Sequence, residues 1–308
     1  MQNLYQQTIV KKISFQGIGL HTGLISKVQL VPGAENTGVV FKRVDLTENN
    51  IIEANFKNVS SAILCTTLKN SFGAAVSTVE HLMAAFYITG VDNVVVEINN
   101  NEIPIMDGSS KDFVNLINKV GLKKMTAKRQ FLKILKKVEL KQGEKKISIK
   151  PAANCFDVEF QLDYKNKIIG KQKNYVSFYE QDLKDVYSSR TFCLFEDIEK
   201  IKKNGLAKGG SLDNAVVIKD KEVLNEGGLR NEKEFANHKI LDLAGDFLLS
   251  GYRMLGSVKC VQGGHYLSNI FIKEVFKDQS NFALVNVDNI EVIKKDFKTS
   301  ANKLAVNA

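Results

Sequence analysis

The order of strand-like and helical segments constrains the fold more than any other feature of the sequence. Residues 8–15, 27–31 and 38–44 are rich in β-branched residues and are separated by glycine-containing turns. Apolar residues at helical spacing then predict an amphipathic helix from about Thr78 to Thr89, and a strand and a second helix from about Ser110 to Val120 follow. Strands, the first of them predicted at residues 131–140, precede helices again after the polar stretch KKMTAKRQ. A doubly wound parallel sheet would alternate strands and helices throughout, so this order predicts an α+β fold.

The length of the chain, 308 residues, is enough for two hydrophobic cores. We therefore predict two layered domains, residues 1–126 and 127–308, each a β-sheet packed on helices, with the active site between them. The second domain contains an inserted α/β unit at about residues 193–223. A long helix follows from about Asn231 to Ser250, and a further strand leads through Gly263 and Gly264 into an apolar helical segment, residues 265–276.

Composition limits the cellular compartments and the kinds of partner that are compatible with this chain. The chain has no apolar run long enough to cross a membrane and begins without the pattern of a signal peptide. Its four cysteines are far apart and form no CxxC pair, which favours a reducing compartment and a cytoplasmic protein. The net charge of +9 suits an anionic partner such as a phosphorylated substrate, a membrane surface or nucleic acid. Because the lysines are spread along the chain, the excess also fits an ordinary solvated surface.

The strongest local pattern is NHKILDLAGD on the long predicted helix. His238, Asp242 and Asp246 fall at i, i+4 and i+8, so an imidazole and two carboxylates share one helix face. Imidazole nitrogen and carboxylate oxygen suit zinc, and His238 with Asp242 can ligate one ion. An exposed ion pair between these two residues is the competing interpretation.

A second pattern, Ser77-Thr-Val-Glu80-His81, lies at the start of the first predicted helix. Ser77 as N-cap and Glu80 three residues later would form a capping box. Alternatively, Glu80 stands beside a metal ligand and accepts a proton from water. Neither HExxH nor HxxEH is present. A catalytic metal needs three protein ligands, and His81 is the natural third beside His238 and Asp242.

The third pattern is Gly263-Gly264-His265 at the start of a predicted helix. A helix N-terminus disfavours an imidazolium, so His265 as a general acid would need a compensating carboxylate, which Asp246 could supply. A helix-capping or loop histidine is the alternative.

Taken together, these segments resemble one family, the UDP-3-O-acyl-N-acetylglucosamine deacetylases, which catalyse the committed step of lipid A biosynthesis. The resemblance extends from residue 15 to residue 270 in the family's order. It is carried by residues 16–23, 77–98, 102–110, 188–199, 205–217, 227–246 and 263–269.

The resemblance implies a zinc-dependent hydrolysis of the N-acetyl group of UDP-3-O-(3-hydroxyacyl)-N-acetylglucosamine, which yields UDP-3-O-acyl-glucosamine and acetate. The implied metal ligands are His81, His238 and Asp242. The implied catalytic residues are Glu80 as general base, His265 as general acid, Asp246 as its orienting partner, Thr191 at the oxyanion and Lys239 near the phosphates. The implied substrate contacts are Phe192 and His21 at the sugar and Ile198, Gly210, Ser211 and Val217 along the acyl chain.

The insert is the part that departs from the family, because Ala207 and Lys208 replace bulkier or apolar residues. The donor set would accept iron(II) as well as zinc. We expect a monomeric enzyme with a single catalytic function that binds no nucleic acid. Peripheral contact with a membrane is possible but not required. Two rival functions are a non-catalytic phosphate- or nucleic-acid-binding module and a metal amidohydrolase with another substrate.

Overall fold

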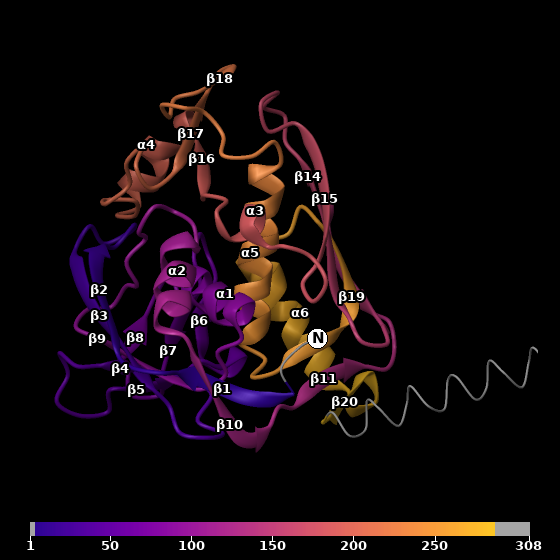
Figure 1. Ribbon diagram of the computed structural model, residues 1–308. Coiled ribbons are helices and arrows are strands. Elements are labelled where there is room, and N and C mark those ends of the chain that lie inside the picture. Colours follow the sequence, from indigo (N-terminus) through magenta and orange to yellow (C-terminus); the bar gives the residue numbers. More distant parts are fainter. Residues whose placement is uncertain (1–3, 287–308) are drawn as a thin grey trace, which may run out of the picture.

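The computed structural model of the chain describes residues 4–286 (Figure 1). Residues 1–3 and 287–308, which belong to the two predicted domains, lie outside the described part. Within residues 4–286, no helix combines the length and the apolar character that a membrane span requires.

The N-terminal half is built on a five-stranded sheet in the order β2-β3-β9-β4-β5. Buried residues alternate along β9, where Val94, Val96 and Ile98 point into the core. Helix α2 packs on this sheet through Phe113 and Phe15, whose ring centroids are 5.3 Å apart. The strands are β2 (Ile13–Ile18), β3 (Ile25–Pro32), β9 (Val94–Ile98), β4 (Val39–Arg43) and β5 (Ile51–Glu53). The helices are η1 (Phe56–Asn58), α1 (Glu80–Thr89) and α2 (Lys111–Val120).

Two smaller sheets complete this half. One joins β6 (Val59–Ser61), β7 (Thr67–Lys69) and β8 (Ala75–Val76). In the other, β1 (Tyr5–Ile9) pairs antiparallel with β10 (Leu122–Lys128). The polar stretch after α2 is thus a strand, and the boundary at residues 126 and 127 stays a prediction.

A seven-stranded sheet forms the C-terminal half, and β19 is its centre because it pairs with β11, β13 and β14. Helix α5 packs on β14 and β15, and α6 packs on β12 and β13. The strands are β11 (Phe131–Ile134), β12 (Val138–Gln142), β13 (Lys145–Lys150), β14 (Phe156–Asp163), β15 (Lys171–Ser177), β19 (Arg253–Val261) and β20 (Phe282–Val285). The helices are α3 (Lys184–Tyr187), α5 (Glu234–Leu248), α6 (His265–Lys277) and η2 (Gln279–Asn281).

The predicted insert forms a small α/β unit at the top of Figure 1. Its three-stranded sheet has the order β16-β17-β18, and helix α4 connects β16 to β17 in the chain. The elements are β16 (Phe192–Leu194), α4 (Phe195–Lys203), β17 (Val216–Lys219) and β18 (Glu222–Val223).

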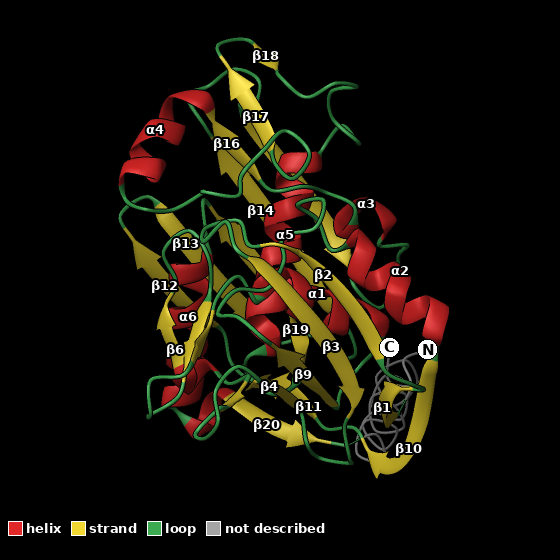
Figure 2. Ribbon diagram, turned by 90° about the vertical axis from the view of Figure 1, so that its left-hand side faces the viewer, coloured by secondary structure: helices red, strands yellow, loops and turns green. Residues whose placement is uncertain are grey.

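Helices α1 and α5 lie between the two large sheets and pack directly on each other (Figures 1 and 2), whereas α4 belongs to the insert. One buried hydrophobic cluster continues through both halves, so the sheets and helices form layers around a shared core. The predicted α+β class is therefore confirmed.

Several details of the prediction are wrong. Helix α1 is not amphipathic, since every residue from Glu80 to Tyr87 is buried, as a helix between layers requires. The segment 8–15 forms two strands in different sheets, because exposed residues 10–12 separate β1 from β2. The segment 131–140 likewise breaks into β11 and β12.

Candidate metal centre and active site

The site begins where α1 and α5 touch. Gly245 of α5 faces the backbone of Glu80, and a Cβ atom at this position would collide with the Glu80 carbonyl oxygen. Glycine therefore allows the two helices to approach closely enough for side chains of both to meet. Every residue of α5 except Lys239 is buried, so the polar residues of this helix are buried as well as the apolar ones.

His81 of α1 and His238 and Asp242 of α5 meet at this contact. The Nε2 atoms of both histidines lie 3.4 Å from Asp242 Oδ1. The three residues are at most 4% exposed, and one ligand atom from each lies within 4.8 Å of the others. Asp242 Oδ1 is buried and accepts no hydrogen bond, which is costly unless an ion occupies the space between these donors. Two imidazole nitrogens and a carboxylate oxygen therefore fit a divalent metal ion.

The surrounding groups prepare these side chains as ligands. His238 Nδ1 lies 3.1 Å from the carbonyl oxygen of Ser189, which can only accept, so Nδ1 carries the proton and Nε2 keeps its lone pair. Burial lowers the pKa of His238 to about 3, which keeps the ring neutral. Lys239 donates a 2.8 Å hydrogen bond to Asp242 Oδ2. Although burial raises the pKa of Asp242, His238 and Lys239 hold it well below its ordinary value.

Glu80 and His265 lie beside this cluster. His265 Nε2 is 3.7 Å from Glu80 Oε1 and 3.8 Å from Asp242 Oδ2. Its other nitrogen, Nδ1, is 2.9 Å from Asp246 Oδ2. Burial would lower the pKa of His265, but the Asp246 and Glu80 carboxylates outweigh it and raise the pKa to about 10. Burial also raises the pKa of Glu80.

The structure decides three of the competing interpretations. The capping box is wrong: α1 begins at Glu80, and the Ser77 hydroxyl donates to the carbonyl oxygen of Asn101 instead. The exposed ion pair is wrong because His238 and Asp242 are buried. The capping histidine is wrong because the His265 ring contacts Asp246 on another helix.

Thr66 is a site residue that the sequence did not reveal. Its backbone N–H donates to Glu80 Oε2 at 3.0 Å, and its hydroxyl donates to Asp246 Oδ1 at 2.7 Å. One buried residue between β6 and β7 thus holds two carboxylates of the site. Ser110 acts on the other side of α1, where its hydroxyl donates to the carbonyl oxygen of His81 at 2.6 Å. Thr66 belongs to no periodic pattern and to no segment that carries the resemblance. Ser110 ends the segment 102–110, but nothing in that segment indicates its contact with His81.

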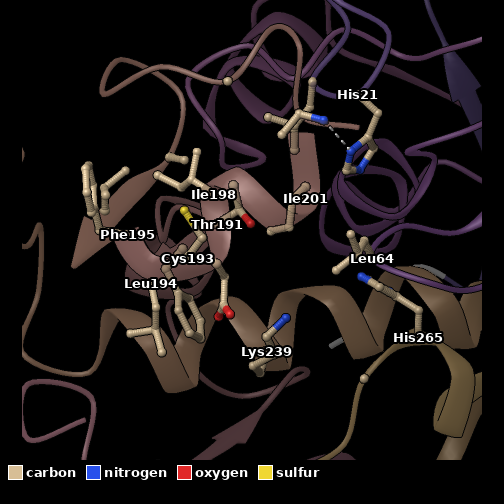
Figure 3. Close-up of a pocket in the computed structure, with 18 of the residues that line it drawn as sticks. His21, Leu64, Thr191, Cys193, Leu194, Phe195, Ile198, Ile201, Lys239 and His265 are labelled. Atoms are coloured by element: carbon tan, nitrogen blue, oxygen red, sulfur yellow. Dashed lines mark hydrogen bonds between the residues drawn. The ribbon is translucent and has the colours of Figure 1, made fainter. Parts of the chain in front are cut away.

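A cavity of about 680 Å³ opens next to the cluster (Figure 3). Lys239 and His265 line it and also contact Asp242, so they connect the cavity to the buried cluster. The wall is mainly apolar on the side of the insert, where α4 contributes Ile198 and Ile201. The predicted site residues that line the cavity are His21, Thr191, Phe192, Ile198, Gly210, Ser211, Val217, Lys239 and His265.

Thr191 and Phe192 link the cavity to the metal cluster. The Phe192 ring packs edge-on against Phe235, with centroids 4.9 Å apart, and Lys239 Nζ lies 5.5 Å from the Phe192 ring centroid. The backbone of Thr191 donates to the carbonyl oxygen of Gly108 and accepts from Val216, both at 2.7 Å. The structure therefore brings all fourteen predicted residues to one buried cluster and one adjoining cavity.

Comparison with known proteins agrees with this geometry. The family model of the UDP-3-O-acyl N-acetylglycosamine deacetylases (LpxC) matches residues 6–277. Among curated proteins, a UDP-3-O-acyl-N-acetylglucosamine deacetylase of Pasteurella multocida is 37% identical over 97% of this chain and 99% of its own length. Proteins of the same name from Geotalea uraniireducens and Citrifermentans bemidjiense are 39% and 41% identical, over 98% and 92% of both chains. The chain belongs to the UDP-3-O-acyl N-acetylglycosamine deacetylase family.

Proposed function

We propose that the chain hydrolyses the N-acetyl group of UDP-3-O-(3-hydroxyacyl)-N-acetylglucosamine to give UDP-3-O-acyl-glucosamine and acetate. One observation carries the proposal: a buried His-His-Asp cluster adjoins an acid–base pair at the end of a large, mainly apolar cavity. Lys239 and His265 in the cavity wall suit the charged and polar part of a nucleotide sugar, and the apolar wall beside the insert suits an acyl chain. The family and the curated relatives support the same reaction.

His81, His238 and Asp242 would hold the metal ion, which leaves a coordination position for water or substrate. When bound, the ion would lower the pKa of a water molecule and polarise the acetamide carbonyl. We propose zinc as this ion, since two imidazoles and one carboxylate form a common catalytic zinc site, and iron(II) accepts the same donors.

Glu80 and His265 move the protons. Glu80 lies against the cluster and is the group that accepts a proton from the attacking water. His265 then gives the proton on Nε2 to the departing amine. Asp246 orients the ring for this step, because its hydrogen bond to Nδ1 leaves Nε2 facing Glu80 and Asp242. Thr191 stabilises the oxyanion, and Lys239 interacts with the charged part of the substrate.

The remaining contacts bind the substrate. Phe192 and His21 face the sugar, and Ile198, Gly210, Ser211 and Val217 line the path of the acyl chain. Residues 1–126 and 127–308 supply the two sides of the site as separate domains. We further propose a cytoplasmic monomer, since the four free cysteines favour a reducing compartment. Peripheral membrane contact is compatible with this reaction but unnecessary for it.

Acetate release tests the proposal. The purified protein should release one acetate per molecule of UDP-3-O-acyl-N-acetylglucosamine and should act far more slowly on UDP-N-acetylglucosamine, which lacks the acyl chain. Deacetylation of both substrates at equal rates would favour another amidohydrolase. Absence of acetate release together with salt-dependent binding of RNA would favour the nucleic-acid module.

A further inference from the structure

Glu102 is a fully buried carboxylate that the reaction described above does not use. Its Oε1 atom accepts hydrogen bonds from the His21 backbone N–H at 2.8 Å and from the Thr78 hydroxyl at 3.0 Å. Its Oε2 atom accepts from the backbone N–H and the hydroxyl of Thr22, at 2.7 and 2.6 Å. A buried carboxylate is costly unless such donors surround it, so these four bonds fix the groups that make them.

One side of this network is the segment that leads into α1. Thr78 has a φ of 56°, a left-handed conformation that a β-branched residue rarely adopts. Its hydroxyl is held by Glu102, and the neighbouring Ser77 hydrogen-bonds Asn101 and Ile103 on either side of Glu102. Glu102 therefore holds the strained backbone two residues before Glu80.

The other side is the turn between β2 and β3, which carries His21. The insert approaches this turn: Gly209 N–H donates to the Leu20 carbonyl oxygen at 3.0 Å, and Lys208 N–H donates to that of His21 at 3.3 Å. A Cβ atom on Gly209 would collide with the carbonyl oxygen of Gly19, so only glycine permits this contact. The turn is thus held by Glu102 from one side and by the insert from the other.

The His21 ring has a defined proton. Its Nδ1 accepts a hydrogen bond of 3.4 Å from the Ala207 N–H (Figure 3), so the proton of the neutral ring sits on Nε2. Burial lowers the pKa of His21, which favours this neutral form. The Nε2 atom is buried without a hydrogen-bond partner, although the ring lines the cavity. A buried donor without a partner at a cavity wall points to an acceptor on a ligand.

We propose that Glu102 is a positioning residue, which fixes the β2–β3 turn so that the Nε2–H of His21 donates to an oxygen atom of the bound substrate. The chemical identity of that substrate rests on the proposed function. The link from Glu102 to His21 does not.

The test is Glu102→Gln, which keeps the shape of the side chain. An amide has one acceptor oxygen, so the backbone N–H of either His21 or Thr22 loses its partner. We expect KM to rise about tenfold, the factor that corresponds to one unsatisfied buried donor, while kcat changes much less. Glu48→Gln, an exchange on an exposed loop, is the matched control and should leave KM unchanged.

A double-mutant cycle separates positioning from general destabilisation. In a His21→Ala background, Glu102→Gln should raise KM little further, because the donor it positions is gone. An equal rise of KM with and without His21 would overturn the proposal.

The ¹⁵N spectrum of the histidine rings gives a reading that needs no turnover. The chain has only four histidines, so His21→Ala identifies the His21 signals. The wild-type ring should carry its proton on Nε2, and Glu102→Gln should produce a mixture of tautomers. An unchanged His21 spectrum in the variant would contradict the proposal, even if the wild type released no acetate and the proposed function failed.

Thr22→Val provides a second route if Glu102→Gln does not fold. Thr22 is partly exposed, and this change removes one hydroxyl bond to Glu102 while it keeps the size of the side chain. KM should rise in the same direction, and Thr22→Ser, which keeps the hydroxyl, should resemble the wild type. Equal KM values for the valine and serine variants would count against the proposal.

Discussion

The buried metal cluster and the insert differ in almost every physical respect. His81, His238 and Asp242 are at most 4% exposed and lie on two helices of the core. Helix α4 of the insert has no buried residue, and its Phe195 is 45% exposed. Lys239 and His265, which lie next to the cluster, line the same cavity as residues of the insert.

The difference separates chemistry from binding. Groups on packed helices are fixed by many contacts, as catalytic and metal-binding groups need to be. A small unit at the surface can adjust to a flexible acyl chain and tolerates replacement more easily. Changes in the cluster should therefore affect metal content and kcat, whereas changes in the insert should affect KM.

The largest effect is expected for Asp242→Ala, which removes the carboxylate that lies 3.4 Å from both histidines. The variant should lose its metal, and its activity should fall by more than about 100-fold. Mutation of a group that only hydrogen-bonds a metal ligand already costs up to roughly 100-fold. Metal analysis and acetate release measure the two effects. Asp213→Ala, on an exposed loop of the insert, should keep both. An Asp242→Ala protein that kept its full metal content would contradict the assignment of this cluster as the metal site.

Glu80→Ala comes next, because it removes a proton acceptor and leaves the three ligands in place. Turnover should fall by about 10²- to 10⁴-fold, the range for general acid–base groups. Metal content, measured by atomic emission, should stay at the wild-type level. A near-normal rate would exclude Glu80 as the base, and loss of metal would make it a supporting group of the metal site instead.

Thr66→Val tests the bridge between Glu80 and Asp246. The change removes only the hydroxyl bond to Asp246, so kcat should fall about tenfold while KM and metal content stay constant. Thr66→Ser keeps that bond and should restore kcat. If valine and serine lowered kcat equally, packing and not the hydrogen bond would explain the loss.

The smallest effect is expected in the insert. Ile198→Ala removes apolar surface from the cavity wall and should raise KM roughly 3- to 10-fold, with kcat and metal content unchanged. Glu199→Ala, on the exposed side of α4, is the control. A fall in kcat as large as that of Thr66→Val would mean that the insert also positions the catalytic groups.

The sequence predicted the elements that have their own periodicity. The long helix and the apolar helix after Gly264 lie within three residues of their expected bounds, because their apolar residues recur at helical spacing. Two of the predicted metal ligands, His238 and Asp242, share a helix face whatever the rest of the fold does. His81 followed instead from the need for a third ligand and from the family resemblance.

Contacts between distant segments were missed. Thr66 and Asp246 are 180 positions apart in the sequence, and Glu102 and His21 are 81 positions apart. No local sequence pattern predicts contacts over such separations. Ser77 and Glu80 had the spacing of a capping box, yet pairing of Ser77 with the segment around Glu102 starts α1 later. Here tertiary contacts outweighed the local signal.

Removal and return of the metal tests the central claim most directly. The protein should be stripped with a chelator, freed of it, and assayed for acetate release from UDP-3-O-acyl-N-acetylglucosamine before and after addition of zinc or iron(II). A requirement for metal in catalysis predicts loss of activity in the metal-free protein and its return at about one equivalent of metal per chain. Acetate release at the original rate by the metal-free protein would contradict it.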